Sequence, residues 1–326
     1  MAFRIASTRD LLKGDGTPAF NEAAFDELKR NADIQWEWLP EDLAEITPDI
    51  AARYDGLHVN APLVTAETVA RDDCRVKIIA RNGVGFDNCD VVACAAKNIT
   101  VTNTPRAIQR PVAVAALTLV FALSGRLMDK DRLARTGRWN DRTDFMGTGL
   151  TGRTLGLIGA GGIGQELIPL ALPFFRQIFV SDPYVETGKL AALGAVKTSF
   201  EQLLAESDFV VTACPLNDET HHLMNSRAFA QMKPSASFIN VARGPVHDEA
   251  ALIRALQSNQ IASAALDVTE TEPLSVTSPL ARMDNVILTP HALCWTDECF
   301  EEIARTALRS IVDVSLGKAP DHIVEP

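Results

Sequence analysis

The fold of this chain is indicated most strongly by the segment Leu155-Gly156-Leu157-Ile158-Gly159-Ala160-Gly161-Gly162-Ile163-Gly164. Its apolar beginning predicts a buried strand, and its second half matches the pattern Gly-x-Gly-x-x-Gly where a helix would start. An acidic residue, Asp182, ends the next predicted strand and lies 18 positions after Gly164. A strand, a glycine turn, a helix and an acidic strand end in this order are typical of a dinucleotide-binding βαβ unit.

Each position of the glycine turn has a physical reason. Gly159 permits the tight turn, Gly161 lets the backbone approach a pyrophosphate, and Gly164 lets the helix and strand pack closely. Gly162 and Ile163 stand at the helix N-terminus, where unpaired N–H groups would bind the phosphates.

Asp182 predicts which dinucleotide binds. A carboxylate accepts hydrogen bonds from both ribose hydroxyls and repels a 2′-phosphate, so the predicted cofactor is NAD rather than NADP.

Strands and helices alternate on both sides of the opening stretch. The second part of the chain predicts strands at residues 155–158, 178–180, 209–213, 238–241, 264–268 and 286–288. The first part predicts strands at residues 3–7, 57–60, 77–80 and 99–102. This pattern predicts an α/β fold with two Rossmann-like, doubly wound parallel-sheet domains and an active-site cleft between them.

A proline-containing break at Asn103-Thr104-Pro105 marks the first domain boundary. We expect residues 1–104 together with 291–326 to form a flavodoxin-like substrate-binding domain. Residues 105–290 are expected to form the NAD-binding Rossmann domain. The helical pattern at residues 297–316 is expected to return to the first domain.

Composition excludes several classes of protein. The 326 residues carry a formal net charge of −11, which is the wrong sign for binding nucleic acid or an anionic membrane surface. The six cysteines are scattered without a Cys-x-x-Cys pair, so we expect a reducing, cytoplasmic location and no metal site. The most apolar stretch, residues 111–124, is too short to span a bilayer, and no signal peptide is evident.

Polar residues gather after the last three predicted strands. Arg243 follows one strand, residues 267–273 follow the next and contain Glu270 and Glu272, and His291 follows the last. In an open α/β sheet, ligands bind outside the carboxyl ends of the strands. An Arg that forks onto a carboxylate and polarises a carbonyl, a His that supplies a proton and a carboxylate that tunes the His together suit carbonyl reduction.

With these residues the chain resembles the D-isomer-specific 2-hydroxyacid dehydrogenases, from about Val76 to Thr306. Asn82-Gly83-Val84-Gly85-Phe86-Asp87-Asn88 is similar to the family's substrate loop, and Val101-Thr102-Asn103-Thr104-Pro105 to its first interdomain crossing. Gly137-Arg138-Trp139 lies in what would be its dimerisation arm, so a homodimer is expected.

The resemblance implies a role for each matching residue. Arg243 would bind the substrate carboxylate and keto oxygen, and His291, hydrogen-bonded to Glu272, would be the acid in reduction and the base in oxidation. The backbone N–H groups of Val84 and Gly85 would hold the substrate carboxylate.

The resemblance also implies cofactor contacts. Asp267 would orient the nicotinamide carboxamide, Thr220 would lie near the pyrophosphate, and Pro215 and Val241 would complete the cofactor site. Trp295 follows His291 closely and is expected to line the substrate pocket.

The chain departs from the family pattern at three places. Val112-Ala113-Val114-Ala115 stands where many members carry an acidic residue, often with a His, and Asn60-Ala61 stands where phosphoglycerate enzymes place Arg-Ser. A phosphorylated substrate is therefore disfavoured. Arg106 and Arg110 would either form a second anion site or face solvent.

The predicted function is NAD-dependent interconversion of a small D-2-hydroxy acid and its 2-keto acid. Two alternatives stay open from the sequence. One is a non-enzymatic NAD(H)-sensing interaction protein of the same fold, and the other is a formate- or phosphite-type dehydrogenase.

Overall fold

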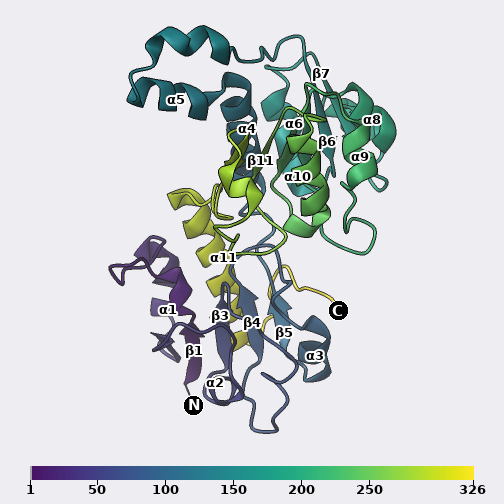
Figure 1. Cartoon of the computed structure of the whole chain (residues 1–326). Helices are drawn as coiled ribbons and strands as arrows, with labels where there is room; N and C mark the ends of the chain where they lie inside the picture. The colour runs from purple at the N-terminus through teal and green to yellow at the C-terminus, as the bar shows by residue number, and fades with distance from the viewer. Residues whose placement is uncertain (1) are drawn as a thin grey trace. The chain divides into compact units, whose positions relative to one another are not determined.

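The computed structural model describes residues 2–326, which divide into two compact units (Figure 1). Within the described residues, unit 1 comprises residues 2–108 and 295–326, and unit 2 comprises residues 109–294. Each boundary falls four residues after the position expected from the sequence.

Unit 1 is built on a five-stranded parallel sheet with the order β2-β1-β3-β4-β5. Its strands are β1 (Phe3–Ser7), β2 (Ile34–Trp38), β3 (Gly56–Val59), β4 (Ile78–Arg81) and β5 (Thr100–Thr102). Its helices are α1 (Asp26–Lys29), α2 (Pro48–Ala51), α3 (Val91–Ala96), α11 (Asp297–Ser315) and the short 3-10 turns η1 (Arg9–Leu11) and η2 (Glu22–Phe25). This strand order is the flavodoxin-like form of the doubly wound sheet.

The sequence interpretation missed strand β2. Its residues Ile34-Gln35-Trp36-Glu37-Trp38 alternate between half-buried apolar and exposed polar side chains, as an edge strand with one covered face should. The alternation is short, and that explains why it was overlooked.

Helix α11 returns to unit 1 as expected and covers one face of its sheet. Thr296 caps the helix by accepting a hydrogen bond from the Cys299 backbone N–H at 3.2 Å. Residues such as Phe300 and Ile311 are buried in one cluster with Ile5 and Ile78 of the sheet.

Unit 2 is built on a seven-stranded parallel sheet with the order β12-β11-β10-β9-β6-β7-β8. Its strands are β6 (Thr154–Ile158), β7 (Gln177–Ser181), β8 (Val196–Lys197), β9 (Phe209–Thr212), β10 (Ser237–Asn240), β11 (Ser263–Leu266) and β12 (Val286–Leu288). The six predicted strands are present, and the two-residue edge strand β8 was missed. The order is that of a Rossmann sheet with one further strand, and the switch point lies between β6 and β9.

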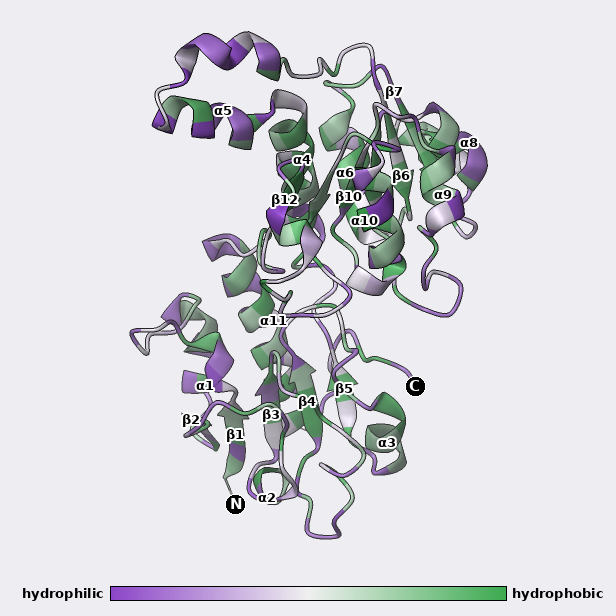
Figure 2. Ribbon diagram, in the orientation of Figure 1, coloured by the Kyte–Doolittle hydropathy of each residue, from purple (hydrophilic) through white to green (hydrophobic). Residues whose placement is uncertain are grey.

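The helices of unit 2 lie on both faces of its sheet. They are α4 (Gln109–Gly125), α5 (Leu127–Arg135), α6 (Gly162–Ala171), α7 (Thr187–Ala192), α8 (Phe200–Glu206), α9 (Ser226–Gln231), α10 (Glu249–Gln257) and the 3-10 turns η3 (Trp139–Phe145), η4 (Gly244–Val246) and η5 (Pro279–Arg282). Figure 2 shows helix α4 mainly green and the segment around α5 mainly purple with green patches.

No single helix within residues 2–326 is long and apolar enough to cross a membrane. Helices α4 and α5, bent by 58° at their junction, pass that test of length and composition only when taken together.

Candidate active site

The glycine turn lies at the carboxyl end of β6. Gly159 has φ +89°, and a Cβ there would lie 2.7 Å from the Cys214 backbone. A Cβ on Gly164 would lie 2.5 Å from the Gly159 carbonyl oxygen, so helix α6 approaches the turn too closely for any side chain. A Cβ on Gly161 would meet nothing within 4 Å. Close packing therefore requires glycine at positions 159 and 164, whereas Gly161 leaves open space where a pyrophosphate would approach.

Asp182 connects the end of β7 to this turn. One carboxylate oxygen accepts a hydrogen bond from the Ala160 N–H at 2.7 Å. The other accepts from the Tyr184 and Val185 N–H groups at 2.8 and 3.0 Å. The half-buried carboxylate is therefore held in one orientation beside the glycine turn.

The loop after β9 contains Pro215 and Thr220. The Thr220 hydroxyl donates to the Pro215 carbonyl at 2.6 Å and shapes the loop into a compact turn. The Tyr184 hydroxyl donates to Glu219 Oε2 at 2.6 Å, which joins this loop to the one that carries Asp182. Two loops at the carboxyl edge of the sheet are thus fixed relative to the glycine turn.

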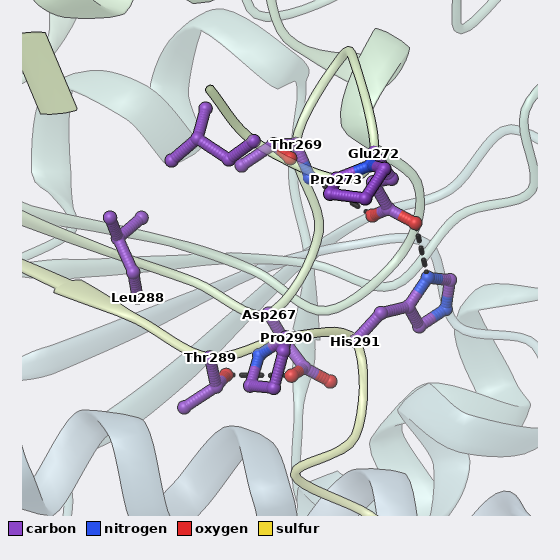
Figure 3. A pocket seen from close by; sticks show the side chains of 9 residues that line it. Asp267, Thr269, Glu272, Pro273, Leu288, Thr289, Pro290 and His291 are labelled. Carbon is purple, nitrogen blue, oxygen red and sulfur yellow. Dashed lines mark hydrogen bonds and ion pairs between the residues drawn. The ribbon is translucent and has the colours of Figure 1, made fainter. Parts of the chain in front are cut away.

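A cavity of about 570 Å³ opens at the ends of β11 and β12 (Figure 3). Its lining residues are Asp267, Thr269, Glu272, Pro273, Leu274, Leu288, Thr289, Pro290 and His291. Three of them, Asp267, Glu272 and His291, are residues that the sequence analysis placed at the site.

Asp267 is 5% exposed and braces the segment that carries His291. One of its oxygens accepts from the Thr289 hydroxyl at 2.6 Å and from the Ala292 and Leu293 N–H groups at 3.1 and 3.2 Å. A buried carboxylate needs such donors to offset its desolvation. No local pattern in the sequence predicted this bracing role.

His291 and Glu272 form a hydrogen-bonded pair across the cavity (Figure 3), with His291 Nδ1 2.8 Å from Glu272 Oε2. Glu272 Oε1 accepts from the Thr269 N–H at 3.1 Å. Burial raises the pKa of Glu272, but the hydrogen bond and charge of His291, the Thr269 N–H and the charge of Arg243 outweigh burial, so the net pKa lies below its ordinary value. Glu272 is therefore a carboxylate that orients the imidazole and leaves Nε2 without a hydrogen bond within residues 2–326.

The backbone at His291 is in the left-handed region, with φ +53°. A non-glycine residue there costs on the order of 1 kcal/mol and persists where its surroundings hold it. The three bonds to Asp267 supply that restraint.

Arg243 follows β10, and its backbone is fixed by Asn240. Asn240 Nδ2 donates to the Arg243 carbonyl at 2.9 Å, and Asn240 Oδ1 accepts from the Ala242 N–H at 2.9 Å. Since β10, β11 and β12 are neighbours in the sheet, their carboxyl ends bring Arg243, Glu272 and His291 to one edge. The positive charge of Arg243 also lowers the pKa of Glu272.

The structure distinguishes the two candidate carboxylates. Glu270 pairs with His222 Nε2 and also accepts from the Glu249 N–H at 3.3 Å, whereas Glu272 pairs with His291. His222 has φ +50° and stacks on His221 with ring centroids 4.1 Å apart. The sequence analysis had no basis for predicting this second His–Glu pair, since its partners are 48 positions apart.

His247 is buried and accepts a hydrogen bond at Nδ1 from Asn240 Nδ2 at 2.9 Å. Burial lowers the pKa of His247 to about 4, and the neighbouring His222 acts in the same direction. The unfolded chain, with a His pKa of 6.5, therefore binds the proton more tightly than the folded chain does.

We expect His247→Gln, which keeps an acceptor for Asn240, to weaken the acid sensitivity of folding. The wild-type chain should lose stability as the pH falls from 6.5 towards 4, and the variant should lose less over the same window. Urea unfolding of both proteins from neutral pH to pH 4 measures this, and parallel pH profiles would contradict the account.

The predicted substrate loop lies in unit 1, after β4. Asn103 Nδ2 donates to the Val84 carbonyl at 2.8 Å, and the Thr104 N–H donates to the Gly83 carbonyl at 2.9 Å. The N–H groups of Val84 and Gly85 donate to no acceptor within residues 2–326. Two adjacent donors without acceptors suit an anionic ligand.

The remaining predicted residues lie as follows. Trp295, in unit 1, is 52% exposed and packs against Phe300 with ring centroids 4.8 Å apart. Arg110, in unit 2, lies 3.5 Å from Glu166, and its ion pair leaves it a weaker anion ligand than a bare cation. Arg106, in unit 1, is exposed.

The glycine turn, the oriented Asp182 and the His–Glu pair define a dinucleotide-dependent oxidoreductase of the doubly wound α/β class. Comparison with known proteins is more specific. The family model for the D-isomer specific 2-hydroxyacid dehydrogenase, NAD binding domain, matches residues 117–292. The chain belongs to this family of NAD-dependent enzymes, which interconvert 2-hydroxy acids and 2-keto acids.

Individual relatives agree with the family match. Glyoxylate/hydroxypyruvate reductase B of Shigella boydii is 40% identical over 246 residues, which are 74% of this chain and 76% of the relative. D-3-phosphoglycerate dehydrogenase of Synechocystis sp. is 35% identical over 269 residues, but these are 82% of this chain and 48% of that relative. The crystal structure of the TT0316 protein from Thermus thermophilus superposes with a TM-score of 0.86 and 30% identity, covering 99% of this chain and 100% of that one.

These findings confirm the predicted family, fold class, enzyme class and NAD cofactor. The chain spans about half the length of the phosphoglycerate dehydrogenase that it matches.

Proposed function

We propose that this protein uses NADH to reduce a small, non-phosphorylated 2-keto acid to the D-2-hydroxy acid, and that it also catalyses the reverse reaction. The observation that carries the proposal is the His291–Glu272 pair at 2.8 Å, which lines a cavity beside Asp267. The resemblance to a glyoxylate/hydroxypyruvate reductase supports a substrate of that size.

The glycine turn fits NAD, because the position of Gly161 is open and the turn begins a helix whose N–H groups suit a pyrophosphate. Gly162, Ile163 and the loop from Pro215 to Thr220 would hold the phosphates. Asp182 would accept from the adenosine ribose, while Val241 and Asp267 would flank the nicotinamide. When bound, the reduced cofactor supplies a hydride.

The chain's own residues would bind the substrate and transfer the proton. Arg243 would form two hydrogen bonds, to the substrate carboxylate and the keto oxygen, and the N–H groups of Val84 and Gly85 would hold the carboxylate. His291 Nε2–H would donate a proton to the keto oxygen, and Glu272 would stabilise the imidazolium before transfer. In the oxidative direction the same nitrogen would accept the proton.

The absence of a cation at residues 60–61 argues against phosphorylated substrates. Asn60 and Ala61 both donate to the Asp10 carboxylate, at 2.7 Å each, so the position is occupied by an anion.

The proposal is tested by following NADH absorbance with a panel of 2-keto acids that includes glyoxylate, hydroxypyruvate, branched, aromatic and dicarboxylic members. Turnover of a small 2-keto acid whose side chain carries no charge supports the proposal. NADH binding without turnover of any acid would favour a sensing protein or oxidation of a compact anion such as formate or phosphite.

Asp182 is expected to set the cofactor preference. We expect Asp182→Ala to reduce the preference for NADH over NADPH by about tenfold or more, because the repulsion of a 2′-phosphate is removed. The ratio of kcat/KM for the two cofactors measures this. An unaltered ratio would remove Asp182 from the ribose site.

We propose a homodimer formed through α4, α5 and the following arm. Large apolar side chains are exposed along these segments, at Leu127 (58%), Met128 (57%), Trp139 (62%) and Met146 (75%). Large apolar side chains exposed on one segment of the chain are consistent with an interface. We also propose a cytoplasmic location, with small acids as the only ligands besides NAD, because the cysteines are scattered and the net charge of −11 disfavours nucleic acid.

A further inference from the structure

Asn60 lies where three parts of unit 1 meet. It follows β3, which lies between β1 and β4 in the sheet, so the carboxyl ends of these three strands are neighbours. The segment containing Thr8 and Asp10 follows β1, and the substrate loop follows β4. The carboxyl edge of such a sheet is where ligands bind.

All four polar groups of Asn60 are used. Its N–H donates to Thr8 Oγ1 at 3.1 Å, and its Nδ2 donates to Asp10 Oδ2 at 2.7 Å. Its Oδ1 accepts from Asn82 Nδ2 at 3.3 Å, and its carbonyl accepts from Asn88 Nδ2 at 3.1 Å. Asn82 and Asn88 are the two ends of the substrate loop. One residue therefore ties both ends of that loop to the end of β1.

The hydrogen bonds behind Asn60 can run in only one direction. The chain of bonds begins at Trp36 Nε1, which can only donate, and it donates to Ser7 Oγ at 2.9 Å. At the other end of the ring, Asn82 Oδ1 can only accept, so His58 donates to it from Nε2 at 3.0 Å. A neutral His58 then has no proton on Nδ1, which accepts from the Ser7 hydroxyl at 3.2 Å.

The chain of bonds ends at a group that can only accept. Asn82, having accepted through Oδ1, donates through Nδ2 to Asn60, and Asn60 donates to the carboxylate of Asp10. The Asp10 carboxylate, which can only accept, fixes the orientation of both amides. His58 is fully buried, which lowers its pKa to about 4 and keeps it neutral at physiological pH, as this direction of bonding requires.

We propose that Asn60 is a positioning residue for the reaction, which holds the substrate loop in the shape that presents the Val84 and Gly85 N–H groups to the substrate carboxylate. The inference rests on the proposed role of those two N–H groups. Donors held in place before the substrate arrives bind it without a cost of reorganisation.

The test uses Asn60→Asp and the double variant Asn60→Asp with Asp10→Asn. The single change places a carboxylate against the Asp10 carboxylate and removes the donor. The double change removes the repulsion between carboxylates, because an amide at position 10 can donate to the new carboxylate at position 60. It does so at the expense of the bond that Asp10 Oδ2 accepts from the Ala61 N–H in the wild type. Asn31→Asp is the matched control, since the Asn31 side chain donates to the Glu27 carbonyl, away from the loop.

We expect Asn60→Asp to raise KM for the 2-keto acid by about tenfold, with kcat and KM for NADH within about twofold of wild type. The double variant should recover part of this loss, and Asn31→Asp should behave as wild type. An unchanged KM in Asn60→Asp, or a double variant as impaired as the single one, would overturn the proposal. Failure of the proposed function has a separate signature, since the wild-type protein would then turn over none of the 2-keto acids.

A second measurement does not depend on activity. Nitrogen NMR of the histidine side chains, with His58→Gln to assign the signal, reports which ring nitrogen carries the proton. The proposal requires the Nε2–H tautomer of His58, neutral from about pH 8 down to about pH 5. A proton on Nδ1, or a charged ring in that range, would contradict it.

Discussion

Replacing His291 should reduce the rate of keto acid reduction by about a hundredfold or more without weakening NADH binding. In the proposed reaction His291 Nε2–H is the proton donor, and the effect of losing a positioned general acid is on the order of 10² to 10⁴ in kcat. In the proposed complex the glycine turn and Asp182 would bind NADH. Asp182 is hydrogen-bonded to the Ala160 N–H, whereas His291 is hydrogen-bonded to Glu272.

The choice of variant follows from the backbone. His291→Ala places alanine at φ +53°, where it is strained, so a loss of activity would have two explanations. His291→Asn tolerates this conformation better and can still hydrogen-bond Glu272, but it cannot act as an acid near neutral pH. Both variants should lose turnover to a similar extent.

The measurements are kcat and the NADH dissociation constant from fluorescence titration, with His322→Asn as the control. His322 also has a positive φ, of 58°, and lies in unit 1 outside the proposed machinery. Turnover by His291→Asn within about tenfold of wild type would exclude His291 as the proton donor.

Replacing Arg243 should have the second large effect. Two charge-assisted hydrogen bonds to the substrate contribute about 1.5–3 kcal/mol each, so Arg243→Ala should lower kcat/KM for the keto acid by roughly a thousandfold. The backbone of this residue is held by Asn240, so removal of the side chain leaves the loop in place.

Arg243→Lys separates charge from geometry. Lysine keeps the positive charge but lacks the planar fork, and it should recover only a small part of the activity. Added guanidinium should partly restore Arg243→Ala and leave Arg243→Lys unchanged. A lysine variant as active as wild type would show that charge alone is required and would contradict the two-bond role.

The parts of the fold predicted correctly were those with strong local signals. The glycine turn after β6 was predictable because each of its glycines meets a separate steric requirement. The strands β6, β9 and β10 were predictable because they are apolar and buried on both faces. Strand β2 was missed because the alternation of half-buried and exposed side chains extends over only five residues. Strand β8 was missed because it has two residues, of which Val196 is 46% exposed.

Residue patterns alone placed the site at the carboxyl ends of the strands, but they did not give the contacts between its side chains. The resemblance implied Glu272 as the partner of His291, whereas the residue pattern alone left Glu270, two positions away, as a rival. The structure pairs Glu272 with His291 and Glu270 with His222. The roles of Asp267 and Asn60 as braces depend on partners far along the chain, such as Asp10, which is 50 positions before Asn60. No local pattern of residue types encodes such contacts.

The central claim is that the chain transfers a hydride from NADH to C2 of a small 2-keto acid. The most direct test is to incubate the wild-type protein with NADH deuterated at C4 and hydroxypyruvate, and to analyse the product by NMR and chiral chromatography. The account predicts a D-2-hydroxy acid that carries deuterium at C2 when the transferred position of the cofactor is labelled. An L product, or cofactor oxidation with no deuterium in the acid from either labelled face, would contradict it.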